Sequence, residues 1–340
     1  MMNRTGLCMR SNFVMFVTIP LAGIACRSEE APNARPRGIT RIAVVGMGRD
    51  HPTWPVLQAV AKQVEGNSGR LEIRIEAPPT VSPMEQKKLL EGLIGQVDVI
   101  CIEPSEQLLL APTIDGIARG GIPVVTFGRD TAGTVRSVYC GPLESDIGEA
   151  AAEACGLLPK VRSTSVLLLH GGDDHAELSE RHRGMRLKMI KSNGMTLLRE
   201  VACGENRLSA LEVVKAETRK YPRSAGWVML DDWPYRAIGA KDRLVPEGYG
   251  VILCSNDPVY LTQVEDGRIT ALVSYDYRKA VQEALFASLR LLDGRGSAFS
   301  ALVVVEPEII TRTNVGHWRE RWRAWQTGEL PPTTSRANAP

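Results

Sequence analysis

The sequence predicts an α/β fold built as two doubly wound parallel sheets that follow one another along the chain. Short runs of apolar and β-branched residues alternate with segments whose apolar residues recur at helical spacing, a pattern typical of a parallel sheet covered by helices. The same plan begins again near residue 145. At 340 residues with 44% hydrophobic side chains, the chain is long enough for two domains with packed cores.

The first sheet is expected to contain four strands and three helices. The first strand is a β-branched run that begins at Ile39 and ends at Gly46. The helix after Ser82 has a capping-box pattern, with Pro83 at its first position and Glu85 three residues after the serine. The expected strands cover residues 39–45, 71–76, 97–102 and 122–127, and the expected helices cover residues 55–65, 83–94 and 112–119.

The second sheet repeats this plan with five strands and five helices. A further helix, a strand and a tryptophan-rich segment follow it, and we expect the last of these to cap the surface. The expected strands cover residues 165–170, 195–201, 226–230, 250–254 and 269–274, followed by 302–306. The expected helices cover residues 145–158, 179–192, 209–220, 237–244 and 258–265, followed by 278–292, and the tryptophan-rich segment is 317–326.

Residues 1–26 have the composition of an export signal. Arg4 and Arg10 are the only charged residues before Cys26, and the apolar stretch between them and the cysteine is too short to span a bilayer comfortably. Pro20 and Gly23 interrupt that stretch, which disfavours the alternative of a hydrophobic helix within the fold. We therefore expect export, to the periplasm or the outer face of the cytoplasmic membrane.

The small residues before Cys26 also resemble a bacterial lipobox, in which the cysteine is lipidated and becomes the first mature residue. Gly23 stands where a lipobox usually has leucine. Lipid attachment at Cys26 would tie the protein to the membrane. Residues 27–38 are polar and contain prolines, as expected of a tether between an anchor and a domain.

The charge balance disfavours a nucleic-acid partner. The chain has 41 basic and 39 acidic residues, and without Arg4 and Arg10 the two counts are equal. The seven cysteines show no CxxC pair and no zinc-type spacing, so no disulfide framework is implied. The segment from His170 to His175 (HGGDDH) has metal-ligand side chains, but its glycines indicate a loop, and we predict no metal site.

Charged and aromatic side chains follow the ends of several expected strands. Asp50, His51 and Trp54 come after the first strand, Arg129 after the fourth, and Asp231 after the third strand of the second sheet. Because parallel sheets bind ligands at the carboxyl ends of their strands, these are candidate ligand-binding residues. An aromatic ring beside polar groups suits a sugar, since the ring stacks on C–H groups while the polar groups bind hydroxyls.

Several of these residues have a second interpretation. Trp54 is equally suited to the core of the first helix, and Arg129 to a surface ion pair with Asp130. Gly46 and Gly48 after the first strand would suit a dinucleotide phosphate, although the rest of the glycine fingerprint is missing.

Four motifs occur in a specific order: GIPVVTFGR at 121–129, RHRG at 181–184, LDDW at 230–233 and DGRITA at 266–271. With the leader and the order of strands, they resemble the type I periplasmic binding proteins of the ribose-binding class, over residues 39–313. The resemblance implies two Rossmann-like lobes, joined by a three-segment hinge, that close on a sugar delivered to an ABC permease. The implied lobes are residues 39–139 with 276–299 and residues 140–275 with 300–313, followed by a tail at 314–340.

The same resemblance implies a set of ligand-binding positions, but two of them depart from the family pattern. Gly128 stands before the first arginine, where aspartate is common, and Asp231 replaces a usual asparagine. A sugar is therefore the first expectation, with a sugar acid, a polyol or a cyclised signal molecule as alternatives. With Asp50 beside them, the implied ligand-binding residues are His51, Trp54, Arg129, Arg181, Asp231, Asn256, Asp257 and Tyr275.

No nucleophile with an adjacent base is evident, which favours binding over catalysis. We expect a monomeric solute-binding protein that needs no cofactor. A secreted nicotinamide-dependent sugar oxidoreductase using Gly46 and Gly48 is the alternative. A transcription regulator with the same core would need an N-terminal helix-turn-helix, whereas residues 1–38 hold the expected leader and tether.

Overall fold

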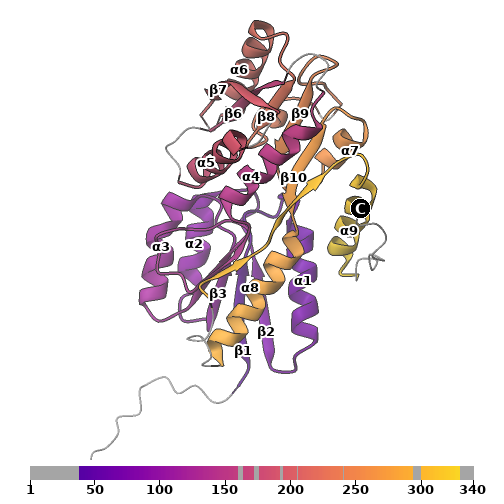
Figure 1. Ribbon diagram of the computed structural model, residues 1–340. Coiled ribbons are helices and arrows are strands. Elements are labelled where there is room, and N and C mark those ends of the chain that lie inside the picture. Colours follow the sequence, from indigo (N-terminus) through magenta and orange to yellow (C-terminus); the bar gives the residue numbers. More distant parts are fainter. Residues whose placement is uncertain are drawn as a thin grey trace, which may run out of the picture. The chain divides into compact units, whose positions relative to one another are not determined.

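The computed structural model describes residues 38–159, 164–171, 176–191, 194–204, 206–239, 241–293 and 300–329. Contacts divide the chain into residues 1–38 and residues 39–340, and the second unit contains every described element (Figure 1). The expected export signal with Cys26, and the expected tether up to residue 37, lie outside the described residues. None of the described helices is long and apolar enough to cross a membrane.

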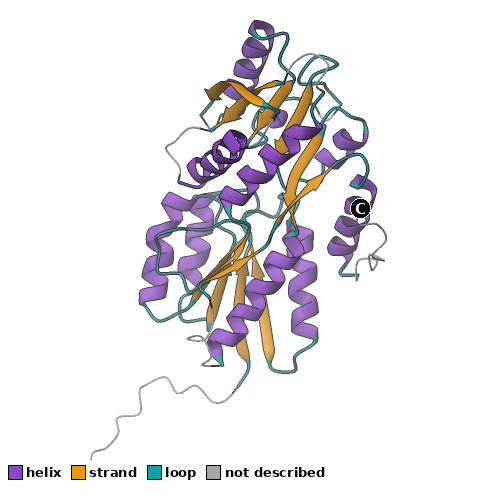
Figure 2. Ribbon diagram, in the orientation of Figure 1, coloured by secondary structure: helices purple, strands orange, loops and turns teal. Residues whose placement is uncertain are grey.

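Residues 39–340 contain two six-stranded sheets covered by helices (Figure 2). The first sheet is parallel throughout, in the order β11-β5-β4-β3-β1-β2. We call it, with the helices on its two faces, the first lobe. Helices α1 (Trp54–Gly66) and α8 (Tyr277–Leu292) cover one face, and α2 (Pro83–Leu93) and α3 (Gln107–Arg119) cover the other. The strands are β1 (Thr40–Val45), β2 (Leu71–Glu76), β3 (Val99–Ile102), β4 (Val124–Phe127), β5 (Val138–Gly141) and β11 (Leu302–Val304).

The second sheet has the order β12-β10-β9-β8-β6-β7 and is parallel except for β12, which runs antiparallel to β10. With its helices it forms the second lobe. Helices α4 (Glu144–Ala154) and α5 (Ala176–Lys191) cover one face, and α6 (Arg207–Lys220) and α7 (Tyr260–Glu265) cover the other. The strands are β6 (Ser165–His170), β7 (Thr196–Ala202), β8 (Gly226–Met229), β9 (Gly250–Cys254), β10 (Ala271–Tyr275) and β12 (Pro307–Ile310).

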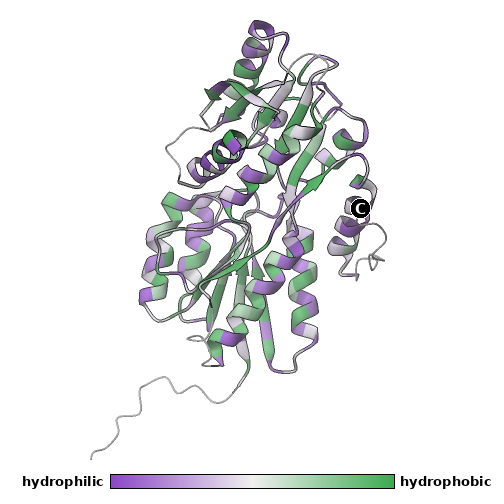
Figure 3. Ribbon diagram, in the orientation of Figure 1, coloured by the Kyte–Doolittle hydropathy of each residue, from purple (hydrophilic) through white to green (hydrophobic). Residues whose placement is uncertain are grey.

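The central strands are buried on both faces. Every residue of Val99–Ile102 and of Val166–Leu169 is fully buried. Figure 3 shows these strands as hydrophobic and the helices around them as mixed, which is the pattern of a parallel sheet between two helical layers. The five cysteines in the described part of the chain are all free and buried, where a thiol behaves as a small apolar side chain.

The chain passes between the lobes three times, as the expected three-segment hinge requires. The passages lie between β5 and α4, between β10 and α8, and between β11 and β12. The first follows Gly141, two residues beyond the boundary expected after residue 139, and the second follows Tyr275. The third differs: β11 pairs with β5, so residues 302–304 belong to the first sheet rather than to the second lobe, and the passage follows them.

The tryptophan-rich segment forms a helix, α9 (Val315–Thr327). It packs against α1 of the first lobe and α7 of the second. Trp318, Trp322 and Trp325 are buried in the core, and the Arg321 guanidinium lies 4.5 Å from the centre of the Trp318 ring. Arg321 also donates hydrogen bonds to carboxylates on both lobes, at the start of α8 and on β12.

Four other elements differ from the sequence expectation. Strands β5 and β12 were not expected, and α3 begins at Gln107 because the Glu106 side chain accepts the backbone N–H groups of the first turn, with Pro112 inside the helix. The helix expected over residues 237–244 is wrong. A short 3₁₀ turn, Tyr235–Ala237, is followed by a loop over the described part of that range.

Candidate ligand-binding cleft

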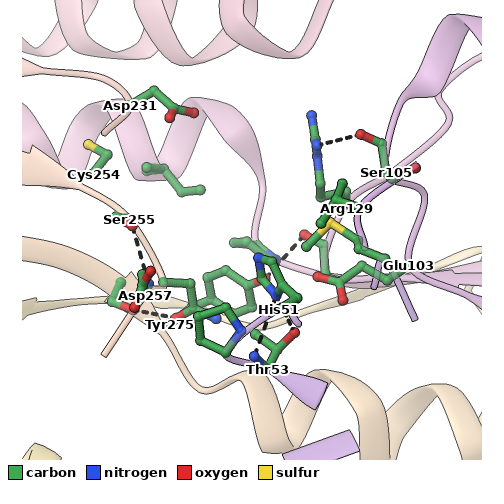
Figure 4. Close-up of a pocket in the computed structure, with 18 of the residues that line it drawn as sticks. His51, Thr53, Glu103, Ser105, Arg129, Asp231, Cys254, Ser255, Asp257 and Tyr275 are labelled. Atoms are coloured by element: carbon green, nitrogen blue, oxygen red, sulfur yellow. Dashed lines mark hydrogen bonds between the residues drawn. The ribbon is translucent and has the colours of Figure 1, made fainter. Parts of the chain in front are cut away.

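A cavity of about 540 Å³ lies where the carboxyl ends of both sets of strands meet. This volume is in the range of small-molecule sites. Figure 4 shows Thr53, Ser105 and Arg129 on the first-lobe side and Asp231 and Asp257 on the second-lobe side. Eight of the nine sequence-predicted ligand-binding residues line it: Asp50, His51, Arg129, Arg181, Asp231, Asn256, Asp257 and Tyr275.

Trp54 is the ninth, and the structure does not bring it to the cavity. As the first residue of α1, it packs against the first-lobe core, and its ring lies 3.3 Å from where a side chain at Gly46 would begin. The core interpretation therefore describes its position. Two other large aromatic side chains line the cavity: Tyr275, and Trp233, which follows the two aspartates after β8 and is 8% exposed.

The first lobe contributes His51, whose ring is held by its neighbour in the loop before α1. His51 Nδ1 and Thr53 Oγ1 are 2.7 Å apart. Burial and the positive charge of Arg236 lower the pKa of His51 to about 4. The imidazole is therefore neutral at pH 7 and carries both a hydrogen-bond donor and an acceptor.

Arg129 follows β4, and its Nη1 donates to the Ser105 backbone carbonyl at 3.1 Å. The neighbouring Asp130, which the sequence offered as its ion-pair partner, accepts a hydrogen bond of 2.7 Å from Arg136. The backbone before Arg129 is connected to the second lobe, because the Tyr275 hydroxyl donates to the Gly128 carbonyl at 3.5 Å. Tyr275 thus lies at the hinge as well as at the cavity.

Arg181 is held in the second lobe by close helix packing. A Cβ at Gly184 of α5 would lie 2.1 Å from the Ser145 carbonyl oxygen of α4, so only glycine allows the two helices to approach this closely. The approach brings the Arg181 guanidinium 2.6 Å from the Glu144 carboxylate. Arg181 Nη1 also donates to the Leu230 carbonyl at 2.6 Å.

The two aspartates after β8 have different surroundings. Asp231 lines the cavity, 3.9 Å from the Arg181 guanidinium, whereas Asp232 is fully buried behind it. The Ser255 hydroxyl donates to Asp232 at 2.9 Å, and Arg236 forms an ion pair with it at 2.5 Å. Burial and the charge of Asp231 raise the pKa of Asp232 to about 7.

Asn256 and Asp257 follow β9 at the cavity wall. The Ser274 hydroxyl donates to Asn256 Oδ1, which directs the amide of the side chain, and Asn256 Nδ2 is buried without a hydrogen-bond partner among the described residues. An unpaired buried donor costs about 1–3 kcal/mol unless a ligand or water accepts from it. Asp257 accepts the Val259 N–H at 2.9 Å, and burial raises its pKa.

Sequence reasoning missed several residues at the cavity. Glu103 directly follows β3, so the strand-end rule that selected Arg129 could have found it. Helix packing brings Glu144 to the cavity, and the loop after β8 brings Arg236 there. The sequence carries no local signal for either placement. The missed residues that line the cavity with polar or aromatic side chains include Thr53, Glu103, Ser105, Glu144, Trp233, Arg236, Ser255 and Ser274.

Other parts of the protein fill the space beside the two glycines that were considered for a dinucleotide phosphate. A Cβ at Gly46 would contact the Trp54 ring at 3.3 Å, and one at Gly48 would lie 2.7 Å from the Val81 backbone nitrogen. These glycines therefore serve close packing of the chain on itself, which leaves the oxidoreductase alternative without its phosphate site.

Of the segment with metal-ligand side chains at 170–175, the structure describes only His170 and Gly171. The rings of His170 and His182 stack with 4.2 Å between centres, and His182 Nε2 lies 2.9 Å from a Glu200 oxygen. No group of three potential metal ligands is found among the described residues. Residues 172–175, which include His175, lie outside them.

Comparisons with known proteins agree with this architecture. No curated protein sequence matches the chain. A solute-binding protein from Burkholderia graminis in complex with D-arabinose has a TM-score of 0.66 at 19% identity, over 82% of this chain and 98% of that one. The glucose-galactose binding protein of Geobacillus stearothermophilus has 0.69 at 18%, over 82% and 99%. A solute-binding protein from Bacillus halodurans with bound myo-inositol has 0.62 at 15%, over 83% and 97%.

At these identities the structural similarity shows the fold alone. The sequence match to a protein family shows which family the chain belongs to. The family described as the periplasmic binding protein domain matches residues 42–296, three quarters of the chain. This range includes both sheets up to β10 and every residue that lines the cavity. The chain therefore belongs to the periplasmic binding protein domain family.

Proposed function

We propose that this protein is exported and captures a neutral monosaccharide or a related polyol between its lobes, for delivery to an ABC permease. Related structures carry D-arabinose and myo-inositol, which supports a polyhydroxylated ligand. The observation that carries the proposal is the polar cavity with an unpaired amide donor at Asn256 Nδ2 and an aromatic ring at Trp233. Polar side chains bind hydroxyls while the ring packs on C–H groups.

The charges at the cavity favour a neutral ligand over a sugar acid. Five carboxyl groups and three guanidiniums line it, so an anion would enter an excess of negative charge. Arg181 is paired with Glu144, and Arg236 is paired with Asp232. His51, neutral at pH 7, adds no positive charge.

Calorimetry and thermal unfolding with a defined panel test this proposal. D-arabinose, D-galactose, D-tagatose and myo-inositol represent neutral ligands, and D-gluconate and D-galacturonate represent anions. We expect at least one neutral compound to raise the melting temperature by several degrees at 100-fold excess over its Kd, because ligand binding to the folded state alone adds about 2.7 kcal/mol. Binding of the acids alone would overturn the neutral-ligand proposal, and no binding at all would overturn the sugar or polyol.

The membrane connection is tested separately. Residues 1–26 direct export in this proposal, and Cys26 carries the lipid that holds the protein at the membrane. We expect the wild-type protein in the membrane fraction and Cys26→Ser in the soluble periplasmic fraction of a Gram-negative host. Cys8→Ser is the matched control. Equal distribution of the three proteins would contradict lipid attachment.

A further inference from the structure

The Glu103 carboxyl group lies at the cavity wall, in the space that a side chain at position 128 would need. Gly128 has a positive φ of 68°, and a Cβ at this position would lie 2.9 Å from Glu103 Oε1. The same Cβ would lie 3.2 Å from the Tyr275 hydroxyl. A side chain at position 128 is thus excluded by conformation and by space, and the Glu103 carboxyl group fills the place where that side chain would lie.

The position of Glu103 is set from several directions. Its backbone N–H donates to the Val45 carbonyl at 2.9 Å, and its carbonyl accepts from Gln86 Nε2 at 2.8 Å. The Tyr277 hydroxyl donates to Oε2 at 2.6 Å. The second oxygen, Oε1, remains beside Gly128, and Glu103 lines the cavity near Arg129 (Figure 4).

We propose that Glu103 is a ligand-binding residue of this cleft, with Oε1 accepting a hydrogen bond from a hydroxyl of the bound sugar or polyol beside Arg129. The proposal rests on the proposed function and adds a residue that selects among its ligands. Glu103 is only 2% exposed, so water has little access to its carboxyl group. Among the described contacts of this carboxyl group, Tyr277 donates to Oε2, so a ligand hydroxyl that donates to Oε1 would add to the stabilisation of the buried carboxylate.

This arrangement also makes ligand binding dependent on pH. Burial raises the pKa of Glu103 to about 7, against the lowering effects of the Tyr277 hydrogen bond and the Arg129 charge. The Tyr275 hydroxyl, the other titratable group beside it, is buried and its pKa is raised well above 10, so it stays neutral. A ligand hydroxyl that donates to the carboxylate favours its charged form, so binding releases a proton and weakens as the pH falls below about 7.

The experiment measures the Kd of the panel compounds by calorimetry between pH 5 and pH 8 for wild type, Glu103→Gln and Tyr277→Phe. For wild type, titration of one group near pH 7 predicts a Kd roughly a hundredfold weaker at pH 5 than at pH 8. Glu103→Gln should weaken binding at pH 8 on the order of tenfold to a hundredfold and flatten the pH profile. Tyr277→Phe removes the donor to Oε2, so the midpoint of the profile should move to higher pH.

Three features of the design keep the outcomes distinct. Glu72→Gln, at an exposed glutamate on β2, is the matched control and should leave Kd and pH profile unchanged. Asp232, whose pKa also lies near 7, is present in all variants, so the comparison with Glu103→Gln isolates Glu103. Wild-type binding with an unchanged Kd and profile in Glu103→Gln would overturn this inference alone. No binding by wild type at any pH would overturn the proposed function, and this inference with it.

Discussion

Arg181 of α5 and Glu144 of α4 form an ion pair of 2.6 Å at the wall of the cavity, with each side chain 14% exposed. The pair joins the first turn of α4 to α5, and Asp231 lies 3.9 Å away on the far side of the guanidinium. Arg181 therefore contributes a positive charge that the protein itself balances. This balance supports the proposal that the cleft takes a neutral ligand.

Glu144→Gln should change the charge preference of the cleft. Removing one partner of a buried ion pair typically destabilises the fold by about 3–5 kcal/mol, because the other charge is left uncompensated. We expect Arg181, which would keep only the more distant Asp231 at 3.9 Å, to strengthen binding of D-gluconate or D-galacturonate relative to the neutral compounds. Calorimetry with the six-compound panel checks this, with Glu149→Gln on the same helix as control. An unchanged preference would show that Arg181 does not contact the ligand.

Gly184→Ala should separate α4 from α5. Its new methyl group would lie 2.1 Å from the Ser145 carbonyl oxygen, which neither helix can relieve by a side-chain rotation. Overpacking of this kind costs about 1–3 kcal/mol. We expect a lower urea midpoint together with weaker ligand binding, since Arg181 is one turn away. Gly116→Ala, in α3 with open space around it, should stabilise by about 0.5–1 kcal/mol, and equal effects at both sites would refute the packing argument.

The alternating pattern of strands and helices was enough to predict both sheets, because parallel strands buried on two faces are continuous apolar runs. Strand β6 and strand β9 have the expected bounds. The assignment of a strand to one of the two sheets was not predicted, because it depends on which distant strand it pairs with. Strand β11 joins the first sheet through β5, and nothing in a three-residue apolar run indicates which lobe it pairs with.

At the site, too, the positions that follow from local sequence were predicted, and those that depend on the three-dimensional path of the chain were not. Arg129 and Asp231 were predicted because they directly follow strands, and parallel strands bring those positions together. Of the two aromatic residues predicted for the site, Tyr275 lines the cavity, whereas Trp54 lies in α1 against the core and Trp233 lines the cavity in addition. Both follow strand ends in sequence, and only the direction in which each loop leaves its strand distinguishes them.

Trp233→Ala and Trp54→Ala should therefore differ in their effect on ligand binding, although both side chains pack on the core. Trp233 lines the cavity, so its loss should weaken sugar binding on the order of tenfold, as expected for an aromatic contact of about 1 kcal/mol plus buried area. Trp54 packs on the first-lobe core, so its loss should lower the melting temperature and change Kd less. Binding affinity and urea unfolding of the two variants decide between these roles. A larger loss of affinity in Trp54→Ala would reverse the assignment.

Helix α9 should contribute to the stability of both lobes together. It packs against α1 and α7, and Arg321 reaches Asp276 at 2.9 Å and Glu308 at 3.0 Å. We expect Trp322→Ala to destabilise by about 3–5 kcal/mol, because its buried ring leaves a cavity between these elements. Arg323→Ala, exposed on the same helix, should have little effect. Two separate unfolding transitions in Trp322→Ala, with one unchanged from wild type, would show that α9 stabilises one lobe only.

The stability of the ligand-free protein should fall between about pH 4.5 and pH 7 through Glu103. Its pKa is raised from 4.5 to about 7 by burial, so in this window the folded protein holds a proton that the unfolded chain has lost. Stability is therefore lost as the pH rises, whereas ligand affinity increases over the same range. Glu103→Gln lacks this group, so its stability relative to wild type should rise with pH and level off above pH 7, with a gain on the order of 3 kcal/mol. The contributions of His51, of opposite sign, and of Asp232 are common to both proteins and cancel in the difference.

Urea unfolding at pH 4, 6 and 8 measures the difference in unfolding free energy between Glu103→Gln and wild type. A difference independent of pH would contradict titration of Glu103 in the folded state.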